Sequence, residues 1–353
     1  MLESLAEDIV TITSDYHHDH DSEFEMTTDH VMGWVNQFEE ADREFILSEL
    51  KHILNQGVYI SKAKAKELLW DFVNRATRYL GYETIDLFLG ETHFISSQAE
   101  HKSQTILLGI LNELLLENTA YTLETCGSIG VRNHIYLDDI IASGGKFNEE
   151  IYRYISEKNI LDALKNKEVR ILSYFFCIHT WGTANARYVL KNRFGEENYF
   201  LNIKDFPVFA YYYIQNNIKE YNQSLNLVYP EKTKNEYDIY LNSLDQAIRQ
   251  TDRGYRKQNQ PSQETFFSSK ENRVRLEQIF LDKGIEIISR IQDEESKRKH
   301  RPLGKTYPSY KTFGTGTLFF CWRNISNTCP IVFWWDNPAH NWRGLFPLQN
   351  RGN

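Results

Sequence analysis

The chain has 353 residues, which is enough to bury a large core in one elaborated domain or in two or three smaller ones. Hydrophobic residues make up 41% and charged residues 25% of it, proportions that exclude an intrinsically disordered chain. The formal net charge of −8 argues against a generally basic surface that coats nucleic acid. The sequence has no apolar run of about 18 residues and no basic signal-peptide region, so we expect a cytoplasmic protein without a membrane segment.

Residues 1–84 are expected to form an acidic, irregular N-terminus followed by a helical unit. In "VMGWVNQF" and "REFILSELKHIL", apolar residues recur at the three- and four-residue spacing of a helix with one buried face. A cluster of histidines and aspartates lies in the irregular part: His17, His18, Asp19, His20 and Asp21. Ligands packed this closely along a chain rarely surround one metal ion, and no spaced motif such as HExxH follows. We therefore interpret the cluster as a flexible acidic segment and not as a metal site.

Strands alternate with helices over residues 85–194. The stretch "IDLFLGETHFISS" is typical of a strand, and "KSQTILLGILNELLLEN" of a buried helix. The run "EVRILSYFFCIHTWG" is apolar without alternation, as expected of a strand covered on both faces, and "TANARYVLKNRF" follows it as a helix. This pattern predicts an α/β fold with a mostly parallel sheet flanked by helices.

The alternation ends near residue 194. Residues 195–270 are rich in Asn, Tyr and Gln without a clear period, and we interpret them as an insertion or hood. Ser269 is well placed to cap a long amphipathic helix over residues 268–291. The stretch "TFGTGTLFFCWRNISNTCPIVFWWDN" is typical of one or two strands, so residues 271–353 are expected to complete the core as an elaborated C-terminal part.

The stretch "HIYLDDIIASGGKF" joins a buried strand, two acidic residues and a glycine turn. Asp138 and Asp139 follow apolar residues, and in an open α/β sheet the ligand-binding residues collect at the carboxyl ends of the strands. The turn into the next helix, called here the 142–146 bend, consists of Ala142, Ser143, Gly144, Gly145 and Lys146. Glycines allow close backbone approach to an anion, and free N–H groups at a helix start bind phosphate.

This arrangement suits a ribose 5-phosphate. A carboxylate accepts hydrogen bonds from the vicinal hydroxyls at one end of the sugar, while the bend binds the phosphate at the other end. Ser143 adds a hydroxyl and Lys146 a positive charge to the bend. The structural alternative is ordinary capping of a turn by Asp138 and Asp139 beside a glycine-rich loop.

The same residues resemble the signature that binds phosphoribosyl pyrophosphate (PRPP) in type I phosphoribosyltransferases. That signature has four apolar positions, two acidic, two apolar, and then small-Thr/Ser-Gly-x-Thr. Lys146 stands where it has the second Thr. Further stretches resemble the phosphoribosyltransferase-like family associated with bacterial conflict and anti-phage systems: "WVNQF", "SKENRVRLE", "RPLG", "FGTGTLFF" and "NISNTCPIVFWWDNPAHNWRGLFP". Together they span most of residues 31–350.

The resemblance implies a role for each part of the motif. Asp138 and Asp139 would hold the ribose hydroxyls, and the 142–146 bend the 5-phosphate. Lys102 and Ser103, within "FISSQAEHKSQ", are the candidates for binding pyrophosphate. Mg²⁺, held mainly through the ligand, would neutralise the charge of the pyrophosphate that leaves the anomeric carbon. The acceptor stays open between a free base, a nucleotide, a nucleic acid and a protein side chain.

Three functions remain open. The first is a phosphoribosyltransferase that works with partner proteins of a bacterial defence system. The second is a non-catalytic sensor that binds PRPP or a nucleotide and gates a partner effector. The third is an interaction scaffold with a vestigial motif. A local basic run also allows nucleic-acid contact or is simply a solvated helix end; it contains Lys297, Arg298, Lys299, Arg301 and Lys305.

Overall fold

Two compact units make up the part of the chain that the structure describes. This computed structural model describes residues 1–17, 24–100, 102–195, 206–216, 225–244, 254–306 and 310–348. The first unit combines Met1–Lys62 with Ile214–Asn350, and the second contains Ala63–Tyr213. This division by contacts differs from the four segments of the sequence analysis, which stay a prediction.

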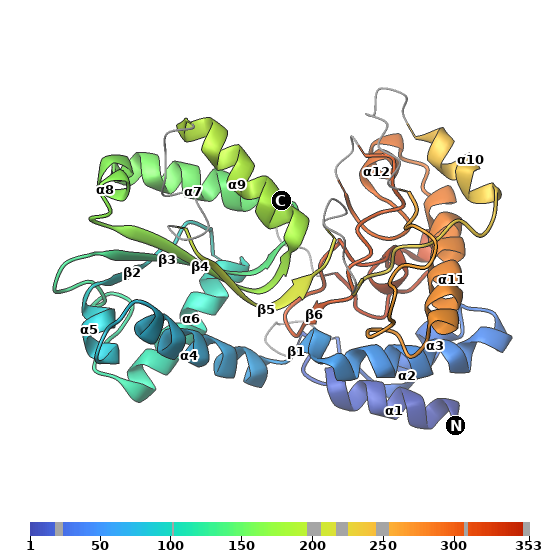
Figure 1. Ribbon diagram of the computed structural model, residues 1–353. Coiled ribbons are helices and arrows are strands. Elements are labelled where there is room, and N and C mark those ends of the chain that lie inside the picture. Colours follow the sequence, from blue (N-terminus) through green and yellow to red (C-terminus); the bar gives the residue numbers. More distant parts are fainter. Residues whose placement is uncertain are drawn as a thin grey trace. The chain divides into compact units, whose positions relative to one another are not determined.

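The second unit is built around a four-stranded sheet with the strand order β2-β3-β4-β5 (Figure 1). Its strands are β2 (Thr92–Phe94), β3 (Asn133–Ile141), β4 (Arg170–His179) and β5 (Val208–Ile214). Its helices are α4 (Lys62–Tyr79), α5 (Ile85–Gly90), α6 (Ser103–Asn118), α7 (Gly145–Lys158), α8 (Leu161–Lys165) and α9 (Thr180–Phe194). The strands β2, β3 and β4 are parallel, so the predicted α/β class with a mostly parallel sheet is confirmed.

Helices cover both faces of this sheet, with α7 and α9 on one side and α4 and α6 on the other (Figure 1). Ile151 of α7 and Leu190 of α9 share a buried cluster with Phe175 of β4. The neighbouring Tyr174 points to the opposite face, where its ring stacks on that of Phe72 from α4 with 4.5 Å between centroids. Successive side chains of one strand therefore pack into two different apolar layers.

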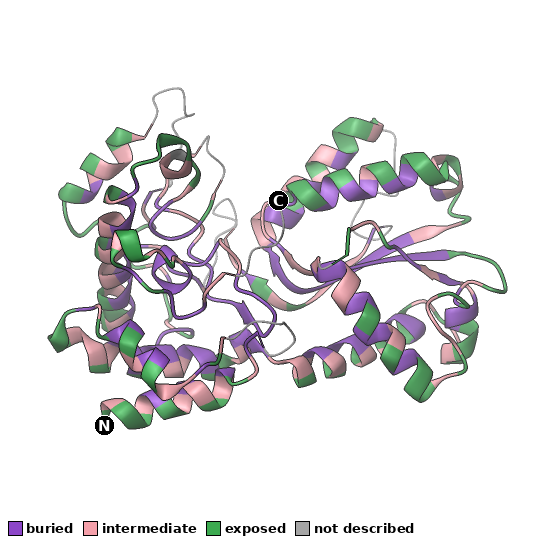
Figure 2. Cartoon of the chain, turned by 180° about the vertical axis from the view of Figure 1, so that it is seen from behind, coloured by how far each residue is buried: buried purple, intermediate pink, exposed green. Residues whose placement is uncertain are grey.

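The two central strands, β3 and β4, are buried along most of their length. Every residue of β4 after Arg170 is buried, and so are the first six residues of β3, Asn133 to Asp138. Figure 2 shows the central strands mainly in the colour of buried residues, whereas the helices alternate between buried and exposed. The predicted strand covered on both faces is confirmed, since continuous burial removes the alternation that a half-exposed strand displays.

The stretch "IDLFLGETHFISS" differs from its prediction as one strand. Ile85–Gly90 forms α5, and only Thr92–Phe94 forms β2. The hydroxyl of Thr84 accepts a hydrogen bond from the N–H of Leu87 at 3.2 Å, which caps the helix. The threonine ahead of this short apolar run was therefore the sequence signal for a helix, although the apolar residues themselves are also typical of a strand.

The first unit combines the N-terminal part of the chain with its C-terminal part up to Asn350. Its helices and strands are α1 (Leu2–Thr13), α2 (Thr28–Val35), α3 (Glu40–Ile53), a π-turn (Leu54–Val58), β1 (Tyr59–Ile60), α10 (Glu236–Ser243), α11 (Lys270–Ser289), α12 (Glu294–Lys299), β6 (Phe320–Cys321) and two 3-10 turns (Ile331–Phe333 and Pro338–His340). The indole N–H of Trp34 in α2 donates to the carbonyl of Val332 at 2.9 Å. Ser269 caps α11 by accepting from the N–H of Asn272, as predicted. The strand β6 pairs with β1 and not with the four-stranded sheet.

The lengths of the helices and the burial of the cysteines are two further features of the fold. None of the helices in the described ranges is both long and apolar enough to cross a membrane. The four cysteines, Cys126, Cys177, Cys321 and Cys329, are buried with free thiols.

Candidate functional site

The 142–146 bend connects the carboxyl end of β3 to the start of α7. Gly144 has a left-handed backbone with φ of +79°, and a Cβ there would lie 2.6 Å from the carbonyl oxygen of Gly182 in α9. A Cβ at Gly182 would lie 1.9 Å from the carbonyl oxygen of Ala142. The side-chain amide of Asn185 donates to the carbonyl of Ser143 at 2.9 Å. The start of α9 therefore packs directly on the bend, which requires glycine at both contact positions.

The bend presents backbone N–H groups at the N-terminus of a 14-residue helix. Among the described residues, none accepts a hydrogen bond from the N–H of Gly144, Lys146 or Phe147, and the N–H of Gly145 reaches only the Ser143 hydroxyl at 3.4 Å. Gly145 and Lys146 are exposed. Unpaired donors at the positive end of a helix dipole form a site that favours an anion.

The Asp138 carboxylate is buried, with 4% of the residue exposed. One oxygen accepts from the Ser103 hydroxyl at 2.5 Å, and the other accepts from the Gln98 amide at 2.9 Å and from Lys146 Nζ at 3.2 Å. Burial raises the pKa of this carboxyl group above its usual value, as does the neighbouring Asp139, while Lys146 and the hydrogen bonds act in the opposite direction. Asp138 thus links Ser103, Gln98 and Lys146 through hydrogen bonds and faces little solvent.

Asp139 occupies a different environment from its neighbour. It is half-buried, and its Oδ1 accepts from the N–H of Ile140 at 2.8 Å. Its own N–H donates to Asp138 Oδ1 at 3.0 Å. Of the two carboxylates, that of Asp139 is therefore the more accessible to a ligand.

Ser103 and Lys102 lie at the start of α6, where Ser103 is the first helical residue and Lys102 precedes it. Ser103 bonds to Asp138, so the structure brings the predicted pyrophosphate residues next to the predicted ribose-phosphate residues. The segment that precedes them, residues 95–102, is called here the β2–α6 loop; of it, His101 lies outside the described residues.

The β2–α6 loop also has unpaired donors. No described residue accepts a hydrogen bond from the N–H groups of Gln98, Ala99 and Glu100. The N–H of Ser97, in contrast, donates to Gln104 Oε1 at 2.7 Å. The loop backbone therefore donates at Ile95, to the carbonyl of Ile135 at 2.7 Å, and at Ser97, and its next three N–H groups are open, which suits contact with a polyanion.

Four residues near the candidate site were not predicted from the sequence: Gln98, Gln104, Tyr136 and Glu150. The Tyr136 hydroxyl donates to Glu150 Oε2 at 2.6 Å and lies 3.2 Å from Asp138 Oδ2. Tyr136 stands two residues before Asp138 on the same strand, so the period of a strand was an available signal for it. The other three come from separate elements, for which the sequence held no comparable signal.

The candidate site and the N-terminus both contain side chains of the kinds that bind metal ions. Within the described ranges, no group of three or more His, Cys, Asp and Glu side chains is placed to hold an ion. The half-buried Asp139 carboxylate supplies a hard oxygen donor, which fits a Mg²⁺ ion that takes its other ligands from phosphate and water. In the predicted N-terminal cluster, His17 is buried and stacks on Tyr16 with 4.0 Å between ring centroids; His18, Asp19, His20 and Asp21 lie outside the described residues.

The basic run at residues 297–305 is partly neutralised by its own helix. Lys299 pairs with Glu295 at 2.5 Å and Lys297 lies 3.8 Å from Glu294. Arg301 is buried and donates to the carbonyl of His300. The two lysine pairs agree with a solvated helix end, whereas Arg301 is buried beyond that helix; nucleic-acid contact stays a prediction.

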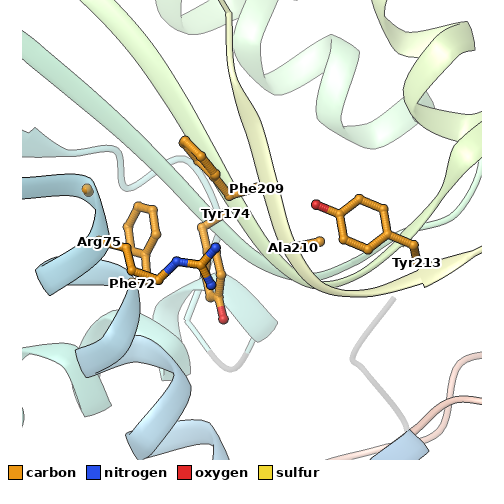
Figure 3. A pocket seen from close by; sticks show the side chains of 7 residues that line it. Phe72, Arg75, Tyr174, Phe209, Ala210 and Tyr213 are labelled. Atoms are coloured by element: carbon orange, nitrogen blue, oxygen red, sulfur yellow. The ribbon is translucent and has the colours of Figure 1, made fainter. Parts of the chain in front are cut away.

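A hollow lies in the same unit between α4, β4 and β5 (Figure 3). Its walls are mostly aromatic, and they include Phe72, Tyr174, Phe209 and Tyr213, with Arg75 beside them. The cavity measures about 30 Å³, which holds a water molecule and not a nucleobase. We therefore assign no ligand to it.

The comparisons with known proteins agree with this geometry at the level of the family. No curated protein and no solved structure matches the chain. The family model described as PRTase-CE matches residues 31–348, which include Ala63–Tyr213 of the second unit, the 142–146 bend, the β2–α6 loop and most of the first unit. The resemblance found in the sequence is confirmed to that extent, and the chain belongs to the PRTase-CE family, a family of phosphoribosyltransferase-like proteins.

Proposed function

We propose that this protein binds PRPP at the carboxyl end of β3 and transfers its phosphoribosyl group. In this proposal the 142–146 bend binds the 5-phosphate, Asp139 the ribose hydroxyls, and the β2–α6 loop with Lys102 the pyrophosphate. One observation carries the proposal: the single carboxylate of Asp138 receives hydrogen bonds from Ser103 and from Lys146. The two segments suited to phosphate groups therefore lie next to each other.

The charge distribution supports a ligand with two anionic ends. The bend offers unpaired N–H groups at the start of α7, and the β2–α6 loop offers a second set. The Lys146 side chain is 53% exposed while it contacts Asp138, so its ammonium group lies at the edge of the site. Asp138 keeps the donors from Ser103, Gln98 and Asp139 if Lys146 turns to a phosphate.

The reaction would be a displacement at the anomeric carbon. The acceptor nucleophile forms a bond to that carbon while the bond to the pyrophosphate oxygen breaks, and pyrophosphate leaves with the electron pair. The protein contributes orientation and N–H donors toward the leaving group, and such a step needs no catalytic triad. A Mg²⁺ ion bound through the ligand and Asp139 would add charge neutralisation.

Calorimetric titration with PRPP and Mg²⁺ tests the binding half of the proposal. We expect heat from the wild-type protein and an affinity about tenfold lower for Asp139→Asn, because the variant loses a charged acceptor for the ribose hydroxyls. Asp162→Asn, in α8 and 90% exposed, is the matched control with unchanged affinity. A wild-type protein that gives no heat with PRPP overturns the proposal.

A pyrophosphate-release assay on the same protein preparation distinguishes a transferase from a non-catalytic sensor. Lys146, at the place of the second Thr of the signature, favours the sensor as the competing function. Pyrophosphate release in the presence of PRPP and fractionated cell extract supports transfer to an acceptor. Binding without release in any fraction favours a sensor that gates a partner protein.

A role in bacterial anti-phage defence is part of the proposal and is supported by the sequence resemblance. Its test is phage plating on a bacterial host that expresses the protein together with the products of its neighbouring genes. Protection that is lost in Asp139→Asn supports the role. Equal plating with and without the wild-type protein contradicts it.

A further inference from the structure

Two buried carboxylates bind the same pair of donors beside the proposed site. Asp138 of β3 is 4% exposed and Glu150 of α7 is 7% exposed. The Gln98 amide donates to Asp138 Oδ2 at 2.9 Å and lies 3.2 Å from Glu150 Oε2. The Tyr136 hydroxyl donates to Glu150 at 2.6 Å and lies 3.2 Å from Asp138. Gln98 and Tyr136 therefore stand between two groups that would otherwise repel each other.

The number of hydrogens decides how these contacts are shared. A tyrosine hydroxyl has one hydrogen, and its shorter contact directs that hydrogen to Glu150. The Gln98 amide has two hydrogens, one for each carboxylate. Burial and the two carboxylates raise the pKa of Tyr136 well above its usual value, so the hydroxyl keeps its proton at neutral pH.

The same network holds the β2–α6 loop at its centre. The Ser97 hydroxyl lies 3.1 Å from both Glu150 Oε2 and Gln104 Oε1, and the Ser97 N–H donates to Gln104 Oε1 at 2.7 Å. The Gln104 amide donates in turn to the carbonyl of Leu137 in β3 at 3.2 Å. The loop is thus tied to β3 and to α7, the two elements that flank the 142–146 bend. Its open N–H groups begin at Gln98, the residue that the carboxylates hold.

We infer that Glu150 and Tyr136 are positioning residues that act through Gln98 to hold the β2–α6 loop in place for the pyrophosphate group. This inference rests on the proposed function. Neither residue needs to touch the ligand: Glu150 is buried, accepts from Tyr136 and Gln98, and has the Ser97 hydroxyl 3.1 Å away. The network then favours PRPP over ribose 5-phosphate, because only PRPP carries the group that the loop contacts.

The test compares two ligands, PRPP and ribose 5-phosphate, each titrated calorimetrically with Mg²⁺. Glu150→Gln and Tyr136→Phe should weaken PRPP binding about tenfold and leave ribose 5-phosphate binding unchanged within error. Gln98→Ala should have the same selective effect from the loop side without altering the core. The matched control is Glu149→Gln, on the same helix, where the carboxylate is 64% exposed and pairs with Arg193 at 2.8 Å.

Each outcome decides the inference. An equal loss of affinity for both ligands, in variants that retain the wild-type melting temperature, indicates a general structural role and overturns the inference. Full retention of PRPP affinity in all three variants overturns it as well. If Glu150→Gln fails to fold, Gln98→Ala and Tyr136→Phe decide. A wild-type protein that binds ribose 5-phosphate with the same affinity as PRPP overturns the inference alone, whereas one that binds neither ligand overturns the proposed function as well.

Discussion

Asp138 and Asp139 show how far the roles of two adjacent, chemically identical residues diverge in a fold. Asp138 is buried and receives hydrogen bonds from Ser103, Gln98 and Lys146. Asp139 stays half-buried and is the better placed for a ligand. In the sequence motif the two carboxylates look equivalent. In the structure the buried Asp138 carboxylate binds other side chains of the protein, and the half-buried Asp139 carboxylate lies at the surface of the candidate site.

His134 carries a prediction about pH at the same scale. It is 6% exposed in β3, its Nδ1 lies 2.7 Å from the Tyr154 hydroxyl, and its Nε2 has no hydrogen-bond partner among the described residues. Burial, with His93 and Lys158 nearby, lowers the pKa of His134 to about 4, below the value of about 6.5 in an unfolded chain. The unfolded state therefore binds a proton first as the pH falls.

The free energy of unfolding should consequently decrease between about pH 6.5 and about pH 4. His134 contributes about 1.4 kcal/mol per pH unit in the middle of that range. Denaturant titrations at several pH values measure the slope. His134→Gln should flatten it by that amount; since burial also lowers the pKa of His30, His93 and His179, some slope should remain. An identical slope in the variant contradicts the assignment.

At the scale of secondary structure, the 142–146 bend depends on the helix behind it. Gly182 in α9 approaches the carbonyl of Ala142 so closely that a Cβ would lie 1.9 Å from its oxygen. The sequence predicted both the strand–bend–helix unit and α9, because each has its own local pattern. It held no signal for the contact between them, which joins residues of two separate elements.

Gly182→Ala should displace the bend. We expect a loss of about 1–3 kcal/mol in the free energy of unfolding, as for overpacked sites, together with weaker binding of ribose 5-phosphate. Gly109→Ala is the control: Gly109 is an exposed residue of α6 with open space around its Cα, and alanine there should stabilise by up to about 1 kcal/mol. Denaturant unfolding and calorimetry measure both effects. Unchanged stability and binding in Gly182→Ala would show that the bend does not need this contact.

The glutamine contacts of the β2–α6 loop follow the same rule. Gln98 and Gln104 are ordinary polar residues in a turn and at a helix start, and nothing in their spacing marks them. Their contacts arise because β3 and α7 bring carboxylates and a carbonyl within reach of their amides. The candidate site was therefore predictable at the bend and only in part at the loop.

For the whole molecule, long-range polar contacts join distant parts of the chain within the first unit. The Glu49 carboxylate of α3 accepts from the N–H of Ser268 at 2.8 Å. Arg273 of α11 is 1% exposed and pairs with Glu264 at 2.5 Å and with Glu277 at 3.3 Å. It also donates to the carbonyl of Leu227 at 3.1 Å. This one side chain therefore links three segments of the unit.

Replacement of Arg273 should destabilise the first unit strongly. Arg273→Met leaves the buried carboxylates of Glu264 and Glu277 short of a partner, and breaking such a network costs about 3–5 kcal/mol. Arg275→Met on the same helix is the control, since Arg275 is 47% exposed and its pair with Asp42 is worth about 1 kcal/mol or less. Denaturant unfolding measures both losses. Equal losses in the two variants would contradict the importance of the buried network.

The sequence by itself determined the elements with a strong local pattern. These are the buried strand β4, the strand–bend–helix unit around Asp138 and Asp139, the capped helix α11, and the family of the protein. Local patterns suffice there because burial periodicity, helix caps and glycine turns are properties of neighbouring residues.

Only the tertiary structure decided which residues share a contact across the sheet. In the tertiary structure Ser103 and Lys146 both donate to the Asp138 carboxylate, and the Gln98 amide lies between the carboxylates of Asp138 and Glu150. The tertiary structure also pairs β6 with β1. Such contacts depend on how separate elements pack, and their hydrogen bonds form between side chains with no fixed distance along the chain. The physical reason is that burial and partners, and not residue type, determine what a carboxylate does.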